Sequence, residues 1–132
     1  MPLTLDDALT EGKCIARVDA LRLRQAFSNL VKNAIKYSPR GGAIEVGLRL
    51  EGYPLSHALC WVSDHGVGIA QEDLPHLFER FYRSQNLDQA LSGLGIGLYL
   101  VRQIITRHGG RLWVDSVQGQ GSTFFLLLPC MY

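Results

Sequence analysis

Apolar residues recur at helical spacing in two parts of the chain. Between residues 21 and 37 they lie three or four positions apart, as on the buried face of a helix. Asp19 can accept the first free amide hydrogens of this helix. The segment Ser38–Gly42 ends it, because proline disfavours helical angles in the residue before it. The apolar face consists of Leu23, Phe27, Leu30, Val31 and Ala34.

A second amphipathic helix is predicted from about Gly95 to His108. The paired glycines at positions 109 and 110 follow it, as is common behind the last turn of a helix. Its inward-facing residues are Leu98, Val101, Ile104 and Ile105.

Five shorter segments have the alternating or continuously apolar pattern that is typical of strands. They are Lys13–Val18, Ala43–Leu50, Ala58–Val62, Leu112–Val117 and Thr123–Leu128. Only two long helices accompany these strands, which favours helices on a single face of one sheet. We therefore expect an α+β fold, a two-layer α/β sandwich with a mixed sheet of about five strands.

Length and charge narrow the possible functions. A chain of 132 residues has the size of one domain, and 13 basic against 12 acidic residues leave a net charge of +1. Binding nucleic acid normally needs a concentrated basic face, so no such partner is expected. The start of the chain lacks the layout of a signal peptide, and no apolar run approaches the ~18 residues of a membrane helix. We expect a soluble domain without a membrane contact of its own.

The cysteines are three in number, Cys14, Cys60 and Cys130, and none forms a Cys-x-x-Cys pair. Such spacing predicts neither a metal site nor a disulfide framework. Unpaired thiols and a cytoplasmic location are the expectation.

Polar residues line one edge of the first helix, beside its apolar face. Asn29, Asn33, Lys36 and Tyr37 fall within one arc of roughly 100°. An asparagine can offer a carbonyl oxygen to Mg2+, a lysine a positive charge to phosphate, and a tyrosine a ring to a base or ribose. For this pattern alone, a solvated helix edge is the alternative.

Asp64 directly follows the most apolar predicted strand and is followed by Gly66, Gly68 and Ile69. A carboxylate in this place can accept a hydrogen bond from an exocyclic amine. Such a site selects adenine over guanine, because guanine would leave the carboxylate unpaired. A plain turn is the alternative.

Two further glycine clusters follow. Gly93, Gly95 and Gly97 precede the second helix, where bare backbone amides and the positive helix end can meet phosphate oxygens. Glycine weakens a helix by about 1 kcal/mol per residue, so stability alone does not explain three of them. The cluster Gly119–Thr123 is typical of a hairpin turn and can also support the nucleotide loop.

Five motifs in this order resemble the N, G1, F, G2 and G3 boxes of the ATP-binding catalytic domain of sensor histidine kinases. The resemblance covers roughly Asp19 to Pro129 and implies the α/β sandwich known as the Bergerat fold. The motifs are Asn29-x-x-x-Asn33, Asp64-x-Gly66-x-Gly68, Phe78–Arg83, Gly93-x-Gly95-x-Gly97-Leu98 and Gly119-x-Gly121-Ser122-Thr123-Phe124.

The resemblance also implies the site residues for ATP and Mg2+. Asn33 is the implied Mg2+ ligand, and Asn29, Lys36 and Arg83 are the implied catalytic residues. The implied nucleotide site consists of Asn29, Asn33, Lys36, Tyr37, Asp64, Gly66, Gly68, Ile69, Phe81, Arg83, Gly93, Leu94, Gly95, Ile96, Gly97, Leu98 and Thr123.

Two features favour phosphoryl transfer over hydrolysis. Related chaperone, gyrase and mismatch-repair ATPases have a water-activating glutamate at the position of Asn29, and asparagine cannot act as a base at neutral pH. The Phe78–Arg83 motif resembles the kinases, and Arg83 can offset charge on the terminal phosphate.

The four histidines, His57, His65, His76 and His108, lack the acidic neighbour usual for a phosphoacceptor in this family. The resemblance therefore implies that this chain is the catalytic part of a larger sensor kinase. It would phosphorylate a histidine on a separate dimerisation domain, with a response regulator downstream. Two alternatives stay open: a serine kinase of the anti-sigma type, and an interaction module that binds nucleotide without transfer.

Overall fold

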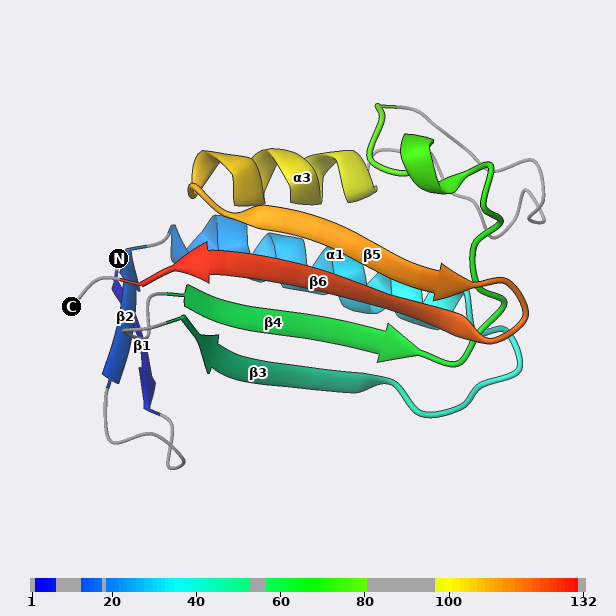
Figure 1. The fold of residues 1–132 in the computed structure, drawn as a ribbon, viewed down its shortest axis with the longest axis horizontal. Coiled ribbons are helices and arrows are strands. Elements are labelled where there is room, and N and C mark those ends of the chain that lie inside the picture. The colour runs from blue at the N-terminus through cyan, green and yellow to red at the C-terminus, as the bar shows by residue number, and fades with distance from the viewer. Residues whose placement is uncertain (1, 7–12, 18, 53–56, 81–96, 131–132) are drawn as a thin grey trace.

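A four-stranded antiparallel sheet forms one layer of the protein and two helices form the other (Figure 1). The computed structural model describes residues 2–6, 13–17, 19–52, 57–80 and 97–130. The strands lie in the order β3-β4-β6-β5. Their bounds are β3 Glu45–Glu51, β4 His57–Asp64, β5 Arg111–Val117 and β6 Gly121–Pro129.

Both helices cover the same face of this sheet (Figure 1). Helix α1 spans Ala20–Lys36, and α3 spans Gly97–Arg107. The predicted cap is confirmed: the Asp19 carboxylate accepts a hydrogen bond from the Arg22 amide at 3.2 Å. The amide of Tyr37 donates to the Asn33 carbonyl and closes the last turn of α1. Helix α1 therefore begins and ends where the sequence predicts.

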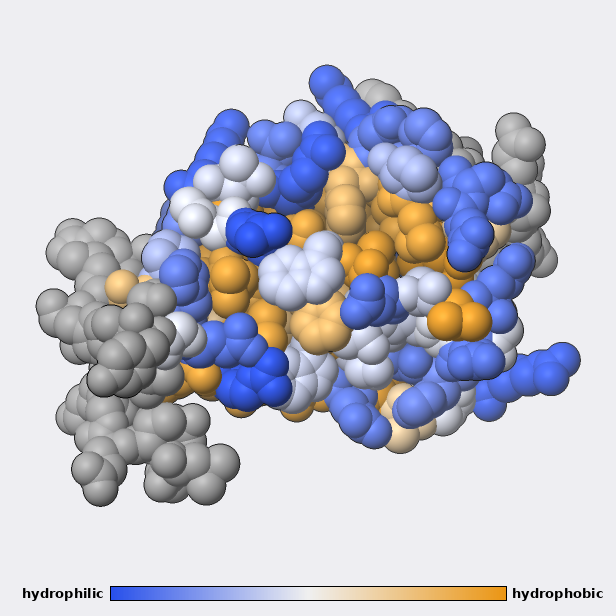
Figure 2. Space-filling model, in the orientation of Figure 1, coloured by the Kyte–Doolittle hydropathy of each residue, from blue (hydrophilic) through white to orange (hydrophobic). Residues whose placement is uncertain are grey.

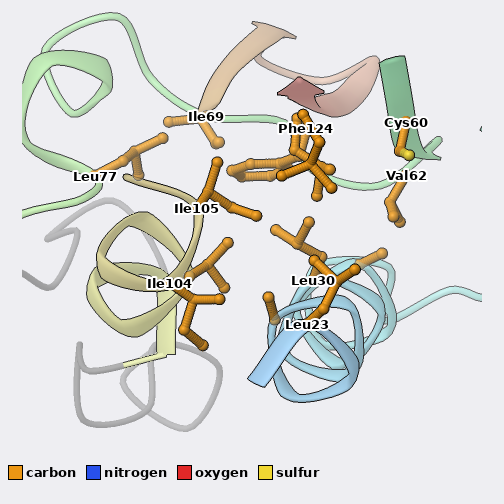
Figure 3. Packing of buried hydrophobic residues seen from close by; sticks show 14 residues of the cluster. Leu23, Leu30, Cys60, Val62, Ile69, Leu77, Ile104, Ile105 and Phe124 are labelled. Atoms are coloured by element: carbon orange, nitrogen blue, oxygen red, sulfur yellow. The ribbon is translucent and has the colours of Figure 1, made fainter. Parts of the chain in front are cut away.

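The core lies between the helices and the sheet (Figure 3). Leu30 of α1, Ile105 of α3 and Leu126 of β6 are each at most 1% exposed. Burying a side chain of this size contributes about 1.5–3 kcal/mol relative to leaving it exposed. Of the predicted apolar face of α1, Phe27 and Val31 are only partly buried, and Ala26 is fully buried instead.

The other face of the sheet carries aromatic rings rather than helices. The ring of Trp61 lies over Gly47, where any Cβ would approach it to 2.0 Å. Trp113 stacks on Phe125 with 5.3 Å between ring centroids. Figure 2 shows this face, with apolar atoms near its centre and hydrophilic side chains around them.

The predicted two-layer α/β sandwich is confirmed, with some differences in the sheet. It has four strands rather than about five, and every strand pair in the described residues is antiparallel rather than mixed. The predicted strand Lys13–Val18 is found as β2, Lys13–Arg17, but it pairs with β1, Pro2–Asp6, in a separate two-stranded sheet. Alternation identifies a strand and its faces but not its neighbours.

A second difference concerns the cysteines. Cys60 is a free, buried thiol, whose pKa burial raises to about 11. Cys130 is disulfide-bonded, so the expectation of unpaired thiols is wrong for this residue. Spacing along the chain could not show this bond, because folding decides which distant segments meet. Among the described residues, no helix is both long and apolar enough to span a bilayer.

Candidate functional site

Several of the predicted site residues lie at one end of the sandwich. There the last turns of α1, the end of β4 and the beginning of α3 meet, at the right of Figure 1. The Asn29 side-chain amide donates a long hydrogen bond of 3.5 Å to the carbonyl of Gly97, the first residue of α3. The N motif and the end of the second glycine motif are therefore neighbours, although 68 positions separate them.

Asn33 lies one turn beyond Asn29 on α1. Its Nδ2 atom is buried and has no hydrogen-bond partner among the residues that the structure describes. Buried polar groups are normally paired, so an unpaired amide needs an explanation. Such a side chain can donate from Nδ2 to a phosphate oxygen and offer Oδ1 to a cation. The donor set at this position therefore fits a magnesium–phosphate group.

Asp64 ends β4 as a carboxylate that is only 4% exposed. Its Oδ1 atom accepts hydrogen bonds from the Gly66 amide at 2.9 Å and the Ser122 amide at 3.3 Å. Within the described part of the chain, no hydrogen bond ends on Oδ2. Burial raises the pKa of Asp64, and the two backbone hydrogen bonds and the nearby His65 oppose this shift. The backbone thus fixes one oxygen and leaves the other for a ligand.

Close backbone contacts hold the loop after Asp64 in place. The Val67 amide donates to the Tyr37 carbonyl at 2.9 Å, and a Cβ on Gly66 would lie 1.9 Å from that same oxygen. Gly68 has a φ of +69°, and a Cβ there would lie 2.2 Å from the Val117 carbonyl oxygen. Only glycine permits both the conformation and the approach.

The third glycine motif supports this loop from the other side. The Gly119 amide donates to the Val67 carbonyl at 2.7 Å. A Cβ on Gly121 would lie 2.2 Å from the Asp64 carbonyl oxygen. The hairpin turn between β5 and β6 therefore contacts the Asp64 loop through its backbone.

Tyr37 lies directly after α1, where its backbone anchors the loop. Its pKa is raised by burial and, to a smaller extent, by the negative charge of Asp73. Asp73 is itself only 3% exposed and precedes the short helical turn η1, Leu74–His76. The phenol therefore stays neutral at physiological pH and presents a ring and a hydroxyl donor.

Thr123 is the predicted site residue that the structure does not bring to this end through its side chain. Its Oγ1 atom pairs with Ser63 Oγ at 2.8 Å. Phe124 belongs to the core on the helix side, and successive strand residues point to opposite faces, so Thr123 faces away from the helices. Its neighbour Ser122 shares the core side with Phe124, and its backbone amide reaches Asp64. That alternation could have identified Ser122 from the sequence.

The remaining predicted residues divide into three groups. Lys36 and Leu98 are partly buried on the two helices, and Ile69 is buried in the core beside the Asp64 loop. In the Phe78–Arg83 motif, Phe78 packs edge-to-face on Phe124 with 6.2 Å between ring centroids. Outside the described residues lie Phe81, Arg83, Gly93, Leu94, Gly95 and Ile96.

Residues 18–131 match the family described as histidine kinase-, DNA gyrase B- and HSP90-like ATPase. The chain belongs to this family. The match includes every residue of the site described above and all four strands of the main sheet.

Sensor histidine kinases are among the curated relatives of this chain. The chain is 42% identical over 114 residues to the sensor-like histidine kinase SenX3 of Mycobacterium tuberculosis, a match that covers 86% of this chain and 27% of that protein. It is 34% identical over 124 residues to the sensor histidine kinase WalK of Bacillus subtilis, covering 92% of this chain and 20% of WalK. The chain thus spans about a fifth to a quarter of the length of these relatives.

Solved structures agree in fold. A mycobacterial sensor histidine kinase, MprB, superposes with a TM-score of 0.79 at 34% identity, over 89% of this chain and 78% of that one. Full-length ShkA in complex with AMPPNP superposes with a TM-score of 0.74 at 27% identity, over 89% of this chain and 23% of ShkA. The chain is therefore a histidine-kinase-type ATPase domain in both sequence and fold.

Proposed function

We propose that this domain binds ATP with Mg2+ and donates the γ-phosphoryl group to a histidine on a separate dimerisation domain. One observation carries the proposal: the unpaired Oδ2 of buried Asp64 and the unpaired amide of Asn33 lie at the same end of the sandwich. The first is an acceptor suited to the adenine amine, and the second suits the phosphates and their metal. The ShkA structure, which contains a nucleotide analogue, supports the nucleotide assignment.

Each residue has a distinct part in this proposal. Asp64 recognises the adenine amine, and Tyr37 lies beside the base or ribose. Asn33 holds Mg2+ through Oδ1, and Lys36 adds a positive charge for the phosphates. When bound, Mg2+ neutralises negative charge on the phosphate oxygens during transfer.

The transfer requires little chemistry from the protein itself. A ring nitrogen of the acceptor histidine attacks the γ-phosphorus, the bond to the β–γ bridging oxygen breaks, and ADP leaves. The protein orients the phosphate chain and stabilises its charge. Asn29 offers an amide rather than a base, so an attacking water molecule is not activated there. This difference favours a kinase over a hydrolase.

The domain is accordingly proposed to be the cytoplasmic catalytic part of a two-component sensor kinase, with a response regulator downstream. The named sensor kinases among its relatives support this assignment.

The test uses ATP labelled at the γ-phosphorus and a dimerisation domain that carries a phosphoacceptor histidine. We expect acid-labile label on that domain, and none on a matched domain with histidine replaced by glutamine. Acid-stable label on serine would indicate a serine kinase instead. ATP binding with no label on any protein would indicate an interaction module.

A further inference from the structure

The hydroxyl of Ser116, in β5, joins three segments of the site. The Ile69 amide donates to its Oγ at 2.8 Å, and the Ser116 hydroxyl donates to the Gly121 carbonyl at 3.0 Å. Ser122 Oγ lies 2.8 Å away. Because the single Ser116 proton goes to Gly121, the Ser122 hydroxyl is the donor in this third contact. One proton and two lone pairs are all that a serine hydroxyl has, so Ser116 uses its full bonding capacity.

Two of these bonding partners connect Ser116 to Asp64, the carboxylate proposed to recognise adenine. The backbone amide of Ser122, whose hydroxyl Ser116 holds, donates to Asp64 Oδ1. Ile69, whose amide Ser116 accepts, ends the loop that begins at Asp64. The Ser116 hydroxyl therefore ties the Ile69 end of the Asp64 loop to β5 and β6, next to the residue whose amide donates to Asp64.

We propose that Ser116 is a positioning residue for nucleotide recognition. Through Ile69 it holds the Asp64 loop, including the Gly66 amide, in the geometry that directs Asp64 Oδ2 toward the ligand. This inference rests on the proposed function, because it deepens the assignment of Asp64 as the acceptor for adenine.

Removing the Ser116 hydroxyl should lower the affinity for ATP, because a smaller fraction of molecules would hold the loop in the geometry that binds. In Ser116→Ala the Ile69 amide loses its acceptor, and a buried unpaired amide is costly. The loop can regain a partner only by moving toward water, which also shifts the Gly66 amide that donates to Asp64 Oδ1. If the binding geometry is then present about one tenth of the time, the apparent Kd for ATP rises about tenfold.

The chain offers a matched control on the opposite face of the same sheet. Ser63 Oγ pairs with Thr123 Oγ1 at 2.8 Å, the same length as the Ser116–Ser122 contact. Ser63 precedes Asp64, yet in the described part of the chain its side chain makes no hydrogen bond to the loop. Ser63→Ala therefore removes a comparable hydroxyl without releasing the Asp64 loop.

The experiment measures ATP–Mg2+ affinity by titration calorimetry and stability by thermal unfolding. It compares the wild-type chain with Ser116→Ala, Ser63→Ala and Ser116→Thr. We expect a Kd about tenfold higher for Ser116→Ala, equivalent to about 1.4 kcal/mol, and a wild-type Kd for Ser63→Ala. Ser116→Thr retains the hydroxyl and should restore most of the affinity.

Three results would overturn the positioning role in a wild-type chain that binds ATP. They are unchanged affinity in Ser116→Ala, an equal loss in Ser63→Ala, and a threonine variant that stays as weak as alanine. A wild-type chain that binds no ATP would instead refute the proposed function, so the two failures are distinguishable.

Discussion

The two ends of the helix layer differ in how their polar groups are paired. At one end, where α1 begins and α3 ends, His108 pairs its two ring nitrogens with the backbone. The Asp19 amide donates to His108 Nε2 at 2.9 Å, and His108 Nδ1 donates to the Ile104 carbonyl at 2.7 Å. At the other end, where α1 ends and α3 begins, Asn33 Nδ2 and Ser38 Oγ are buried without a partner in the described part of the chain.

This difference in pairing indicates which end contributes to the stability of the fold and which end is suited to a ligand. Leaving a buried polar group unpaired costs about 1–3 kcal/mol, so such groups are rare where only folding matters. The paired end ties the first turn of α1 to the last turn of α3. On the proposed function, the unpaired end keeps donors and acceptors for the nucleotide, and binding offsets the cost of leaving them without partners.

The largest expected effect concerns hydrolysis at the unpaired end. The isolated chain should bind ATP yet hydrolyse it very slowly, because Asn29 provides no base. General-base catalysis is typically worth about 10²–10⁴-fold in rate, so its absence should be plain in a phosphate-release assay. A purified chain that turns over ATP several times per second without a partner would refute the kinase assignment.

Next in size is the loss of the Asn33 side chain. Asn33→Ala should abolish the enhancement of ATP affinity by Mg2+, a loss of about 1.5–3 kcal/mol if the bond to a charged group is removed. Without ligand the variant should be no less stable than the wild type, since Nδ2 has no partner within the described residues. Calorimetric titrations with and without Mg2+ measure the first effect, and thermal unfolding the second.

Gln25→Ala is a suitable control, because Gln25 is exposed on the same helix two turns earlier. An Asn33→Ala chain with normal circular dichroism and an unchanged response to Mg2+ would exclude the metal role.

The third prediction concerns Asp64, where a substitution should weaken binding and increase stability. Asp64→Asn should weaken ATP binding by about 1–3 kcal/mol, because an amide nitrogen in place of Oδ2 cannot accept from the adenine amine. ATP should also bind the wild type more tightly than GTP. Equal affinities for the two nucleotides in calorimetry would remove the adenine assignment.

The same variant should be more stable than the wild type without ligand at neutral pH. Burial raises the pKa of Asp64, so the folded wild type loses stability as the pH rises from the ordinary carboxyl pKa through the raised value. The advantage of Asp64→Asn should therefore be full at neutral pH and disappear in acid. Thermal unfolding across this range measures it, and an advantage that grows toward low pH would contradict the burial argument.

The smallest expected effect is at the paired end. His108→Ala should lower the free energy of unfolding by about 1 kcal/mol, because it removes the acceptor for Asp19 and the donor to Ile104. ATP affinity should not change. Arg107→Ala, an exposed change one residue earlier, should stay within about 0.5 kcal/mol of the wild type. A weakened ATP affinity in His108→Ala would show that the two ends are coupled.

Much of the fold could be predicted from the sequence because it depends on local periodicity. The apolar spacing placed α1 and α3 within about two residues, and the side chain of Asp19 caps the first helix as expected. Asp64, Asn29 and Asn33 were identifiable because each stands at a fixed position relative to a strand end or a helix face. Their meeting at one end follows once the helices lie over the sheet.

Tertiary structure alone decided what depends on contacts between distant segments. The sequence contained Ser116 but no sign that its hydroxyl would meet Ile69, 47 positions earlier. It contained Cys130 but not its disulfide, and the strand Lys13–Arg17 but not its pairing with β1. Strand register decides which side chain faces the helices, since a shift of one residue exchanges the two faces. Local pattern therefore determined the elements and most of the site's chemistry, whereas register and packing determined which side chains complete the site.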